Sequence, residues 1–362
     1  MSAERDLRLL PKAHLHIHLE GAMRPGTLSD LCRKYGIERP VDTRGQQFNN
    51  FSGFNAVYRS ACDCIQTKED LARVIQEVAE DAASEGVIWL EPAFDADRYS
   101  IMRDITSHKL FTSAEEGWEF ALSQAEQVSK QTGVGIGYIS AIDRTQPIER
   151  GLQRAKLTAK IVKAKKHLIR VTTDYFDDIY PGIIGLGLHG NEEGFPPELF
   201  TDAFRIGLDG TGLLSTPHAG EIAPSPSKGA ASVATALDLL KADRIQHGVL
   251  AIEDPNLVSK LAQTNVCLDV CPSSNIQLSV FRDIGNHPLP ELIKAGVKCT
   301  IGSDDPLLFG PNLIDEYQVC RHNMGLDDST LAQLAKNSFK YSGAPLEIKN
   351  SGLRQIEKWL SS

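Results

Sequence analysis

Eight short apolar segments, separated by stretches with helical periodicity, constrain the fold of this 362-residue chain more than any other feature. Several are too short and too uniformly apolar for half-exposed antiparallel strands, and they match parallel strands that are buried on both faces. The segments are His14–Leu19, Val87–Glu91, Gly135–Ala141, Ile183–Leu188, Leu213–Ala219, Arg244–Gly248, Val266–Cys271 and Lys298–Ser303.

Amphipathic helices are predicted between these strands. One apolar helix face repeats at intervals of three and four residues, through Leu71, Val74, Ile75, Val78, Ala79 and Ala82. A second helix is predicted over Leu152–Ile169, with a solvated face formed by Lys156, Lys160, Lys163, Lys165 and Lys166. Strands that alternate with helices in this way predict an α/β fold, a single (β/α)8 TIM-type barrel.

One domain is expected over residues 1–362, although the length alone would suggest two domains of about 150 residues. No linker rich in Pro, Gly or Ser divides the chain. The longest connection, residues 20–86, is predicted to include a helical lid insertion after the first strand. Its Phe48, Phe51, Phe54 and Tyr58 would form either an apolar roof over the barrel or ordinary packing inside the insertion.

Charge and composition limit the partners. The 38 Lys and Arg residues against 47 Asp and Glu residues give a net charge of −9, which argues against a nucleic-acid partner. The sequence has neither an apolar run long enough for a membrane span nor the apolar core of a secretory signal, so a cytoplasmic protein without membrane association is expected. Seven cysteines in such a chain are expected to be free thiols, with no disulfide or cysteine metal site.

The first strand ends in two histidines with the spacing of metal ligands. Side chains alternate along a strand, so His16 and His18 should point to the same side. His14 should share that face, so the spacing alone leaves open which two of the three bind a metal.

Three further strands bring the same kinds of donor to the end of the barrel where active sites lie. The fifth strand ends at His218 and is followed by Glu221, the sixth ends at His247, and the eighth is followed by Asp304 and Asp305. Imidazoles and carboxylates without a thiolate favour zinc over iron or manganese. The sequence therefore predicts a metal site at this end of the barrel.

A set of motifs runs through nearly the whole chain in the order LPKAHLHIHLEGAMRP, LHGNE, HAGE, QHG, CPSSN, HP, GSDDP and AKNSF. This set resembles the adenosine deaminase family of the metal-dependent amidohydrolase superfamily. The resemblance implies one Zn²⁺ per subunit, with the ligands His16, His18, His218 and Asp304. It also implies that Glu221 is the proton shuttle, that His247 lies beside the attacking hydroxide, and that the substrate site includes His18, Glu20, Asp305 and the backbone N–H of Gly190.

The resemblance implies hydrolytic deamination of a 6-aminopurine nucleoside. We expect Glu221 to protonate purine N1, His247 to steer or accept the water proton, and Asp304 to hold the attacking oxygen. Asp305 could donate to N7 if a raised pKa, caused by the like charge of Asp304, keeps it protonated.

Glu20 matches the acidic position that contacts the ribose 5′-hydroxyl in this family, and a carboxylate there would repel a 5′-phosphate. Adenosine or deoxyadenosine, converted to inosine or deoxyinosine and ammonia, is therefore the expected substrate. Relatives that act on adenine, N6-substituted adenines or 6-aminodeoxyfutalosine leave those substrates open. The chain departs from the family pattern at His14, His189 and Pro92-Ala93. Each departure is either a change in specificity or neutral.

Two other functional classes are alternatives to a deaminase. One is a hydrolase of a cyclic amide or ester built on the same barrel, and another is a non-catalytic purine or growth-factor-receptor binder. The catalytic residue types present argue against the second. A dinucleotide site is not expected at the GLGLHG sequence beginning at Gly185, because those glycines lie in and just after an apolar run and do not open a helix.

Overall fold

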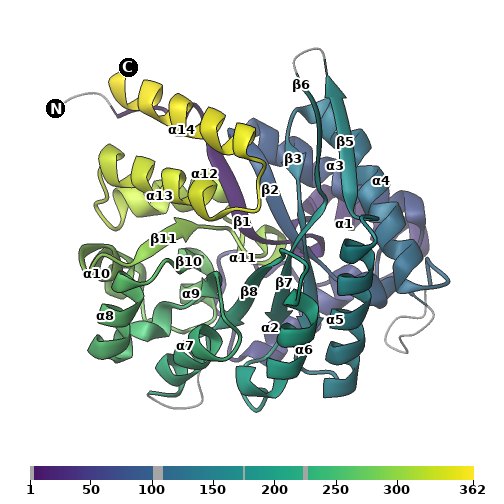
Figure 1. The fold of residues 1–362 in the computed structure, drawn as a ribbon, viewed down its shortest axis with the longest axis horizontal. Helices are drawn as coiled ribbons and strands as arrows, with labels where there is room; N and C mark the ends of the chain where they lie inside the picture. The colour runs from purple at the N-terminus through teal and green to yellow at the C-terminus, as the bar shows by residue number, and fades with distance from the viewer. Residues whose placement is uncertain (1–3, 101–108, 174–175, 223–226) are drawn as a thin grey trace.

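Eight parallel strands form the centre of the computed structural model, which describes residues 4–100, 109–173, 176–222 and 227–362 (Figure 1). Each strand overlaps one of the eight predicted segments, and neighbours in the sheet follow the chain order. The strands are β1 (Lys12–His18), β2 (Val87–Phe94), β4 (Tyr138–Asp143), β7 (Ile183–His189), β8 (Leu214–Ala219), β9 (Arg244–His247), β10 (Cys267–Val270) and β11 (Lys298–Ile301).

The first and last strands meet and nearly close the barrel. Ile17 forms a parallel bridge with Asp304. The backbone N–H of His18 donates to the Asp304 carbonyl at 3.0 Å, and the Asp304 N–H donates to the His16 carbonyl at 3.1 Å. The (β/α)8 prediction is confirmed, and this junction places the histidines of β1 beside Asp304.

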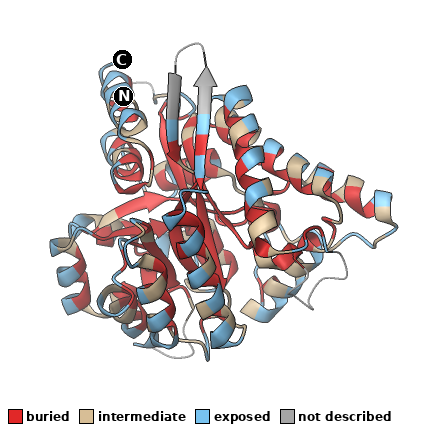
Figure 2. Cartoon of the chain, turned by 45° about the vertical axis from the view of Figure 1, so that its right-hand side comes forward, coloured by how far each residue is buried: buried red, intermediate tan, exposed pale blue. Residues whose placement is uncertain are grey.

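Helices surround the strands, so that the barrel is buried and the outward helix faces are exposed (Figure 2). The predicted apolar face at residues 71–82 is buried in α3, which begins with a capping box between Thr67 and Asp70. The helices are α1 (Pro25–Tyr35), α2 (Phe51–Cys62), α3 (Lys68–Ser84), α4 (Ala114–Thr132), α5 (Ile148–Lys163), α6 (Thr201–Leu208), α7 (Lys228–Asp238), α8 (Pro255–Gln263), α9 (Pro272–Gln277), α10 (Leu289–Lys294), α11 (Pro306–Phe309), α12 (Leu313–His322), α13 (Asp328–Tyr341) and α14 (Leu346–Ser361).

The predicted helix over Leu152–Ile169 is wrong at its carboxyl end. Helix α5 ends at Lys163, and the antiparallel hairpin β5 (Leu168–Thr173) and β6 (Phe176–Pro181) follows it. Exposed Leu168 alternates with buried Ile169, which is the period of a strand that is covered on one face. The five lysines of this region are exposed, as predicted. The third predicted segment is divided between two strands. Its first two residues form the short strand β3 (Gly135–Ile136), which pairs with β2, and β4 begins at Tyr138.

The long connection after β1 contains the short 3-10 helix η1 (Glu20–Ala22) and helices α1, α2 and α3. Phe51, Phe54 and Tyr58 of α2 line the main pocket, while Phe48 packs edge-on against Phe54 at a ring separation of 5.5 Å. The connection thus supplies both a pocket wall and internal packing. That it moves as a lid stays a prediction.

An irregularity in β1 turns His14 away from the other two histidines. The pairing between β1 and β2 shifts register between His14 and Ile17. His14 accepts a hydrogen bond from the Ser303 N–H at 3.1 Å and lines a separate cavity, whereas His18 lines the main pocket. The expectation that His14 shares the face of His16 and His18 is therefore wrong, because strict alternation fails at this register shift.

All seven cysteines are buried free thiols. Among the described residues, no helix combines the length and the apolar character that a membrane crossing requires.

Candidate active site

The main pocket opens at the carboxyl ends of the barrel strands, with an empty volume of about 730 Å³ that includes its solvent-open part. This size is within the range of small-molecule sites. Its floor is formed by predicted site residues from four separate parts of the barrel. Those that line it are His18, Glu20, Gly190, His218, Glu221, Asp304 and Asp305.

The four predicted metal ligands converge at the bottom of this pocket. The Nε2 atoms of His18 and His218 lie 3.3 Å apart. The Asp304 Oδ1 atom lies 3.3 Å from His18 Nε2 and 3.5 Å from His16 Nε2. All four residues are buried and have one donor atom each within 4.8 Å of the others.

These separations fit a tetrahedral zinc ion. Bonds of about 2.0–2.1 Å place neighbouring ligand atoms roughly 3.3 Å apart. His16 Nδ1 lies 2.8 Å from the Asp269 carbonyl, which must accept, so that Nδ1 carries the proton and the lone pair is on Nε2. His16 Nε2 is buried without a hydrogen-bond partner among the described residues, which fits a nitrogen whose lone pair binds a metal.

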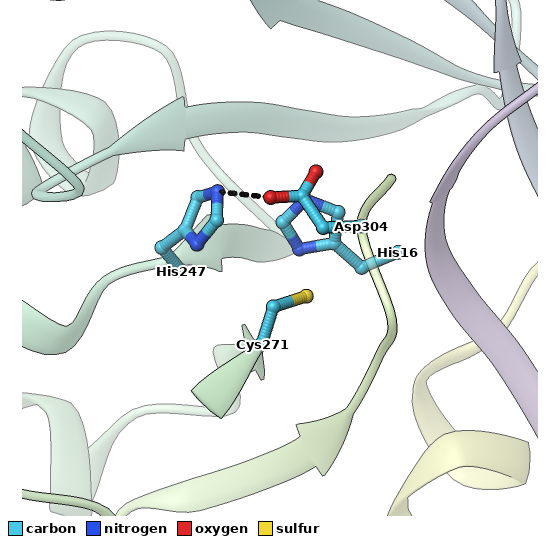
Figure 3. A group of neighbouring side chains, drawn as sticks. All are labelled: His16, His247, Cys271 and Asp304. Carbon is cyan, nitrogen blue, oxygen red and sulfur yellow. Dashed lines mark ion pairs between the residues drawn. The ribbon is translucent and has the colours of Figure 1, made fainter. Parts of the chain in front are cut away.

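A second donor set overlaps the first and includes Cys271, although no cysteine metal site was expected from the sequence. His247 and Cys271 lie beside His16 and Asp304, and the Cys271 side chain points toward this group (Figure 3). Burial raises the pKa of the Cys271 thiol well above its usual range, and the Asp304 charge adds to the effect. Three members of the set with three imidazoles, His18, His218 and Asp304, line the pocket, whereas Cys271 does not, so that set is the better candidate for a zinc site.

His247, Glu221 and Asp304 meet on one side of the donor set. His247 Nε2 lies 3.4 Å from Glu221 Oε1 and 3.8 Å from Asp304 Oδ2. His247 and Asp304 have φ values of 63° and 59°, in the left-handed region that non-glycine residues rarely adopt. Such strain is concentrated at functional sites, where surrounding contacts hold it.

The pKa values of three buried carboxyl groups are shifted in different directions. Burial raises the pKa of Glu221 well above its usual range, and the charges of Asp304 and Glu192 raise it further. Burial and Asp304 likewise raise the pKa of Asp305. The pKa of Asp304 is held well below its usual range, because His16, His18 and His247 outweigh its burial. The pKa of Asp304 is therefore shifted in the opposite direction to those of Glu221 and Asp305, and a raised pKa of Asp305 is what its expected role requires.

Two glycines permit this packing. A Cβ atom at Gly21 would lie 1.6 Å from Asp305 Oδ1, so a larger residue there would displace the carboxyl group. Gly190, at the end of β7, has a φ of 93° and lines the pocket.

Glu20 faces the pocket but is already held by two tyrosines. Its carboxylate accepts hydrogen bonds from Tyr99 at 2.9 Å and from Tyr58 at 3.3 Å. Since a carboxylate can accept about four hydrogen bonds, a substrate hydroxyl could still be bound.

Several supporting residues were not assigned roles from the sequence. Ser274 donates to Asp304 Oδ2 at 2.7 Å, and Asn275 lies 3.3 Å from His247 Nδ1. Glu192 accepts from the backbone N–H groups of Gly220 and Glu221 at 2.8 and 3.1 Å, which fixes the loop after β8. These residues belong to the CPSSN and LHGNE motifs, which indicated that they are part of the family pattern. Their hydrogen-bond partners depend on the tertiary structure.

The departures from the family pattern lie in different environments. His189 and Ala93 line the main pocket, with the His189 ring centre 5.8 Å from that of His18. His14 is on the other side of β1. The GLGLHG sequence lies on β7 and its end, and the next helical element begins at Pro197, so the rejection of a dinucleotide motif agrees with the structure.

Comparison with known proteins places these features in a family. The family model for adenosine deaminase matches residues 11–359. A Streptomyces coelicolor relative named for adenosine/adenine deaminase is 36% identical, with 99% of each chain covered. An aminodeoxyfutalosine deaminase of Acidothermus cellulolyticus is 31% identical over 87% of this chain and 83% of its own. The crystal structure of an adenine deaminase from Arthrobacter aurescens superposes with a TM-score of 0.82, at 26% identity and with 97% and 99% of the two chains covered. This chain belongs to the adenosine deaminase family and is an enzyme of the adenosine/adenine deaminase type.

Proposed function

We propose that this enzyme is a zinc-dependent deaminase of 6-aminopurine nucleosides, with adenosine or deoxyadenosine as substrate. The observation that carries the proposal is that the four buried candidate metal donors and the buried carboxyl group of Glu221, whose pKa is raised, meet at the bottom of one pocket. The ligands His16, His18, His218 and Asp304 would hold one Zn²⁺ per subunit.

Bound zinc would supply a nucleophile at neutral pH by lowering the pKa of a water molecule from 15.7 to about 7, which corresponds to about 12 kcal/mol. The raised pKa of Glu221 favours its protonated form, which can donate to purine N1, so that the ring accepts the electron pair when the oxygen nucleophile adds to C6. The neutral Asp305 carboxyl group can donate to N7, and the Gly190 N–H supplies a second contact. The Glu221 carboxylate can then take the proton of the added hydroxyl group and pass it to the 6-amino group, so that the C6–N bond breaks, ammonia leaves and the C6–O bond becomes the product carbonyl. The next water molecule would restore the Glu221 proton.

Acidic groups around the pocket favour a nucleoside over a nucleotide. Glu20, Asp95 and Asp143 line the pocket on the side of α2 and the strand ends. Although Arg59 and Arg98 also line it, Arg59 approaches Asp143 at 3.9 Å and Arg98 approaches Asp63 at 4.0 Å. A 5′-phosphate would bring two negative charges close to Glu20, which is repulsive in a partly desolvated site.

The test is ammonia release by the zinc-loaded enzyme from adenosine, deoxyadenosine, adenine, AMP and 6-aminodeoxyfutalosine. Adenosine or deoxyadenosine is expected to have the highest kcat/KM and AMP the lowest. A higher value for adenine or 6-aminodeoxyfutalosine would overturn the nucleoside assignment and leave a deaminase. Hydrolysis of a cyclic amide without ammonia from any aminopurine would overturn the proposal altogether.

The Glu20→Gln variant tests the ribose contact separately. Loss of the charged acceptor is expected to raise KM for adenosine about tenfold, equivalent to about 1.4 kcal/mol, and to leave KM for adenine unchanged. An exposed matched control is Glu193→Gln. Equal effects of Glu20→Gln on both substrates would contradict the contact.

A further inference from the structure

We propose that Asn275 and His287 are positioning residues that hold His247 with its ring proton on Nε2, so that His247 acts in the pocket as a hydrogen-bond donor and not as a proton acceptor. The three side chains form a buried chain of contacts behind the pocket. The meaning of this arrangement for catalysis rests on the proposed function, but the position of the proton can be measured without any substrate.

The direction of the hydrogen bonds among these three side chains is set by a backbone group that can only donate. The backbone N–H of Leu289, at the start of α10, donates to His287 Nδ1 at 3.2 Å. A proton on Nδ1 would face this N–H, which excludes both the other tautomer and the imidazolium form. Burial also lowers the pKa of His287 to about 4. His287 is therefore neutral and carries its proton on Nε2.

The orientation of the Asn275 amide follows from this tautomer. His287 Nε2 lies 3.0 Å from Asn275 Oδ1, and the ring N–H can donate only to that oxygen. A flipped amide would place two donors against each other at this distance, which is unfavourable in a buried site. The Asn275 NH₂ group must then point toward His247.

The same reasoning fixes His247. Asn275 Nδ2 lies 3.3 Å from His247 Nδ1, so Nδ1 accepts and the proton of the neutral ring is on Nε2. Nε2 is the atom that points to Glu221 and Asp304, at 3.4 and 3.8 Å. It has no hydrogen-bond partner in the described part of the chain. The His247 N–H is thus directed at the place where the attacking oxygen must lie.

This arrangement separates two roles that the sequence left open for His247. With a proton already on Nε2, the ring can orient the attacking oxygen and stabilise negative charge on it, but it has no lone pair there to accept a proton. Proton transfer on this side of the pocket is left to Glu221. Reversal of the tautomer would turn a lone pair toward the Glu221 and Asp304 carboxyl groups.

The direct test is ¹⁵N NMR of the zinc-loaded protein with labelled histidine, since protonated and unprotonated ring nitrogens have clearly different shifts. His247→Gln assigns the His247 signals by their loss. The expected result is a proton on Nε2 and a lone pair on Nδ1. A proton on His247 Nδ1 in the unmodified protein would overturn the proposal, whether or not the protein deaminates purines.

Three variants test the roles of Asn275 and His287. Asn275→Asp replaces the donor with an acceptor of the same shape and should place a proton on His247 Nδ1. We expect kcat to fall by at least about 10²-fold and KM to stay within about threefold, because the loss is confined to the transition state. His287→Gln can still donate to Asn275 Oδ1 and should keep the tautomer, whereas His287→Leu cannot donate.

Metal content and thermal unfolding of each variant separate these effects from a general loss of structure. A folded, zinc-loaded Asn275→Asp protein with an unprotonated Nδ1 or an unchanged kcat would contradict the role of Asn275. Equal loss in the two His287 variants would contradict the role of His287. If a variant does not fold, the spectrum of the unmodified protein still decides the tautomer.

Discussion

Protonation at the site is governed by three acidic residues that are buried close together. The neighbouring imidazoles lower the pKa of Asp304, whereas burial and the Asp304 charge raise the pKa values of Glu221 and Asp305. In the proposed function, these opposite shifts favour an anionic metal donor and two proton donors for a purine ring in one pocket. Different roles therefore follow from different environments of the same functional group.

Glu221→Gln is expected to abolish proton transfer and to retain the metal, because Glu221 is outside the four-donor set. The loss in kcat should be on the order of 10²–10⁴-fold, the usual contribution of general acid–base catalysis. Ammonia release and metal content by mass spectrometry check this result, with exposed Glu193→Gln as the control. Near-normal turnover of the variant would refute the shuttle role.

Replacement of one residue from each donor set distinguishes the two candidate metal sites. His218→Ala should lower the zinc content from one ion per subunit to nearly none, since His218 belongs only to the set with three imidazoles. Cys271→Ser should retain one ion, since Cys271 belongs only to the alternative set. The opposite pattern would assign the metal to the group in Figure 3.

At the scale of elements, a buried carboxyl group joins helix α3 to the start of α12. Glu85 caps the carboxyl end of α3 and accepts from the Leu313 N–H at 3.0 Å. Burial raises its pKa from 4.5 to about 7, against the opposing effect of the Leu313 N–H. The packing of these elements is therefore sensitive to pH near neutrality.

The sign of this sensitivity follows from linkage. The unfolded chain loses the Glu85 proton near pH 4.5 and the folded chain near pH 7, so the stabilisation is complete below about pH 4.5 and is lost as the pH rises through about 7. Glu85→Gln keeps an acceptor for Leu313 and removes the titration. Its free energy of unfolding, relative to that of the wild type, should rise between pH 5 and pH 8, by up to about 3 kcal/mol.

Urea unfolding of both proteins at the two pH values checks this prediction, and the difference between them cancels contributions that they share. Glu119→Gln, at an exposed site, is the matched control. A difference between Glu85→Gln and the wild type that does not change with pH would contradict it.

At the scale of the molecule, three of the four candidate metal donors lie where the barrel closes. His16 and His18 come from the first strand and Asp304 from the segment after the last, and backbone hydrogen bonds join the two. His218 comes from β8 on another part of the barrel. A bound ion would therefore connect distant parts of the chain and stabilise the folded state selectively.

Removal of the metal should lower Tm and restoration of zinc should recover it. Free zinc at about 1,000 times its Kd would contribute about 4 kcal/mol to the free energy of unfolding. Calorimetry before and after chelation measures the shift, with His218→Ala as a variant that should be insensitive to chelator. The same Tm with and without metal in the wild type would contradict the link to stability.

The sequence alone determined the eight strands, their order and the convergence of histidines and acidic residues at one end of the barrel. These features depend on local periodicity and on the position of polar residues just after apolar strands, both of which are present in the linear chain. The contacts of Asn275 with His247 and His287 could not be predicted, since they join the end of strand β9, helix α9 and the segment before α10.

Only the tertiary structure decided that His14 turns away from the metal donors, that α5 ends before the β5–β6 hairpin and that Cys271 lies beside His16. A register shift in β1 depends on its pairing with β2, and the hairpin is stabilised by side chains that pack across elements. The physical reason is the same in each case: local patterns set which residues form an element, whereas register, packing and hydrogen-bond direction depend on partners that are distant in the sequence.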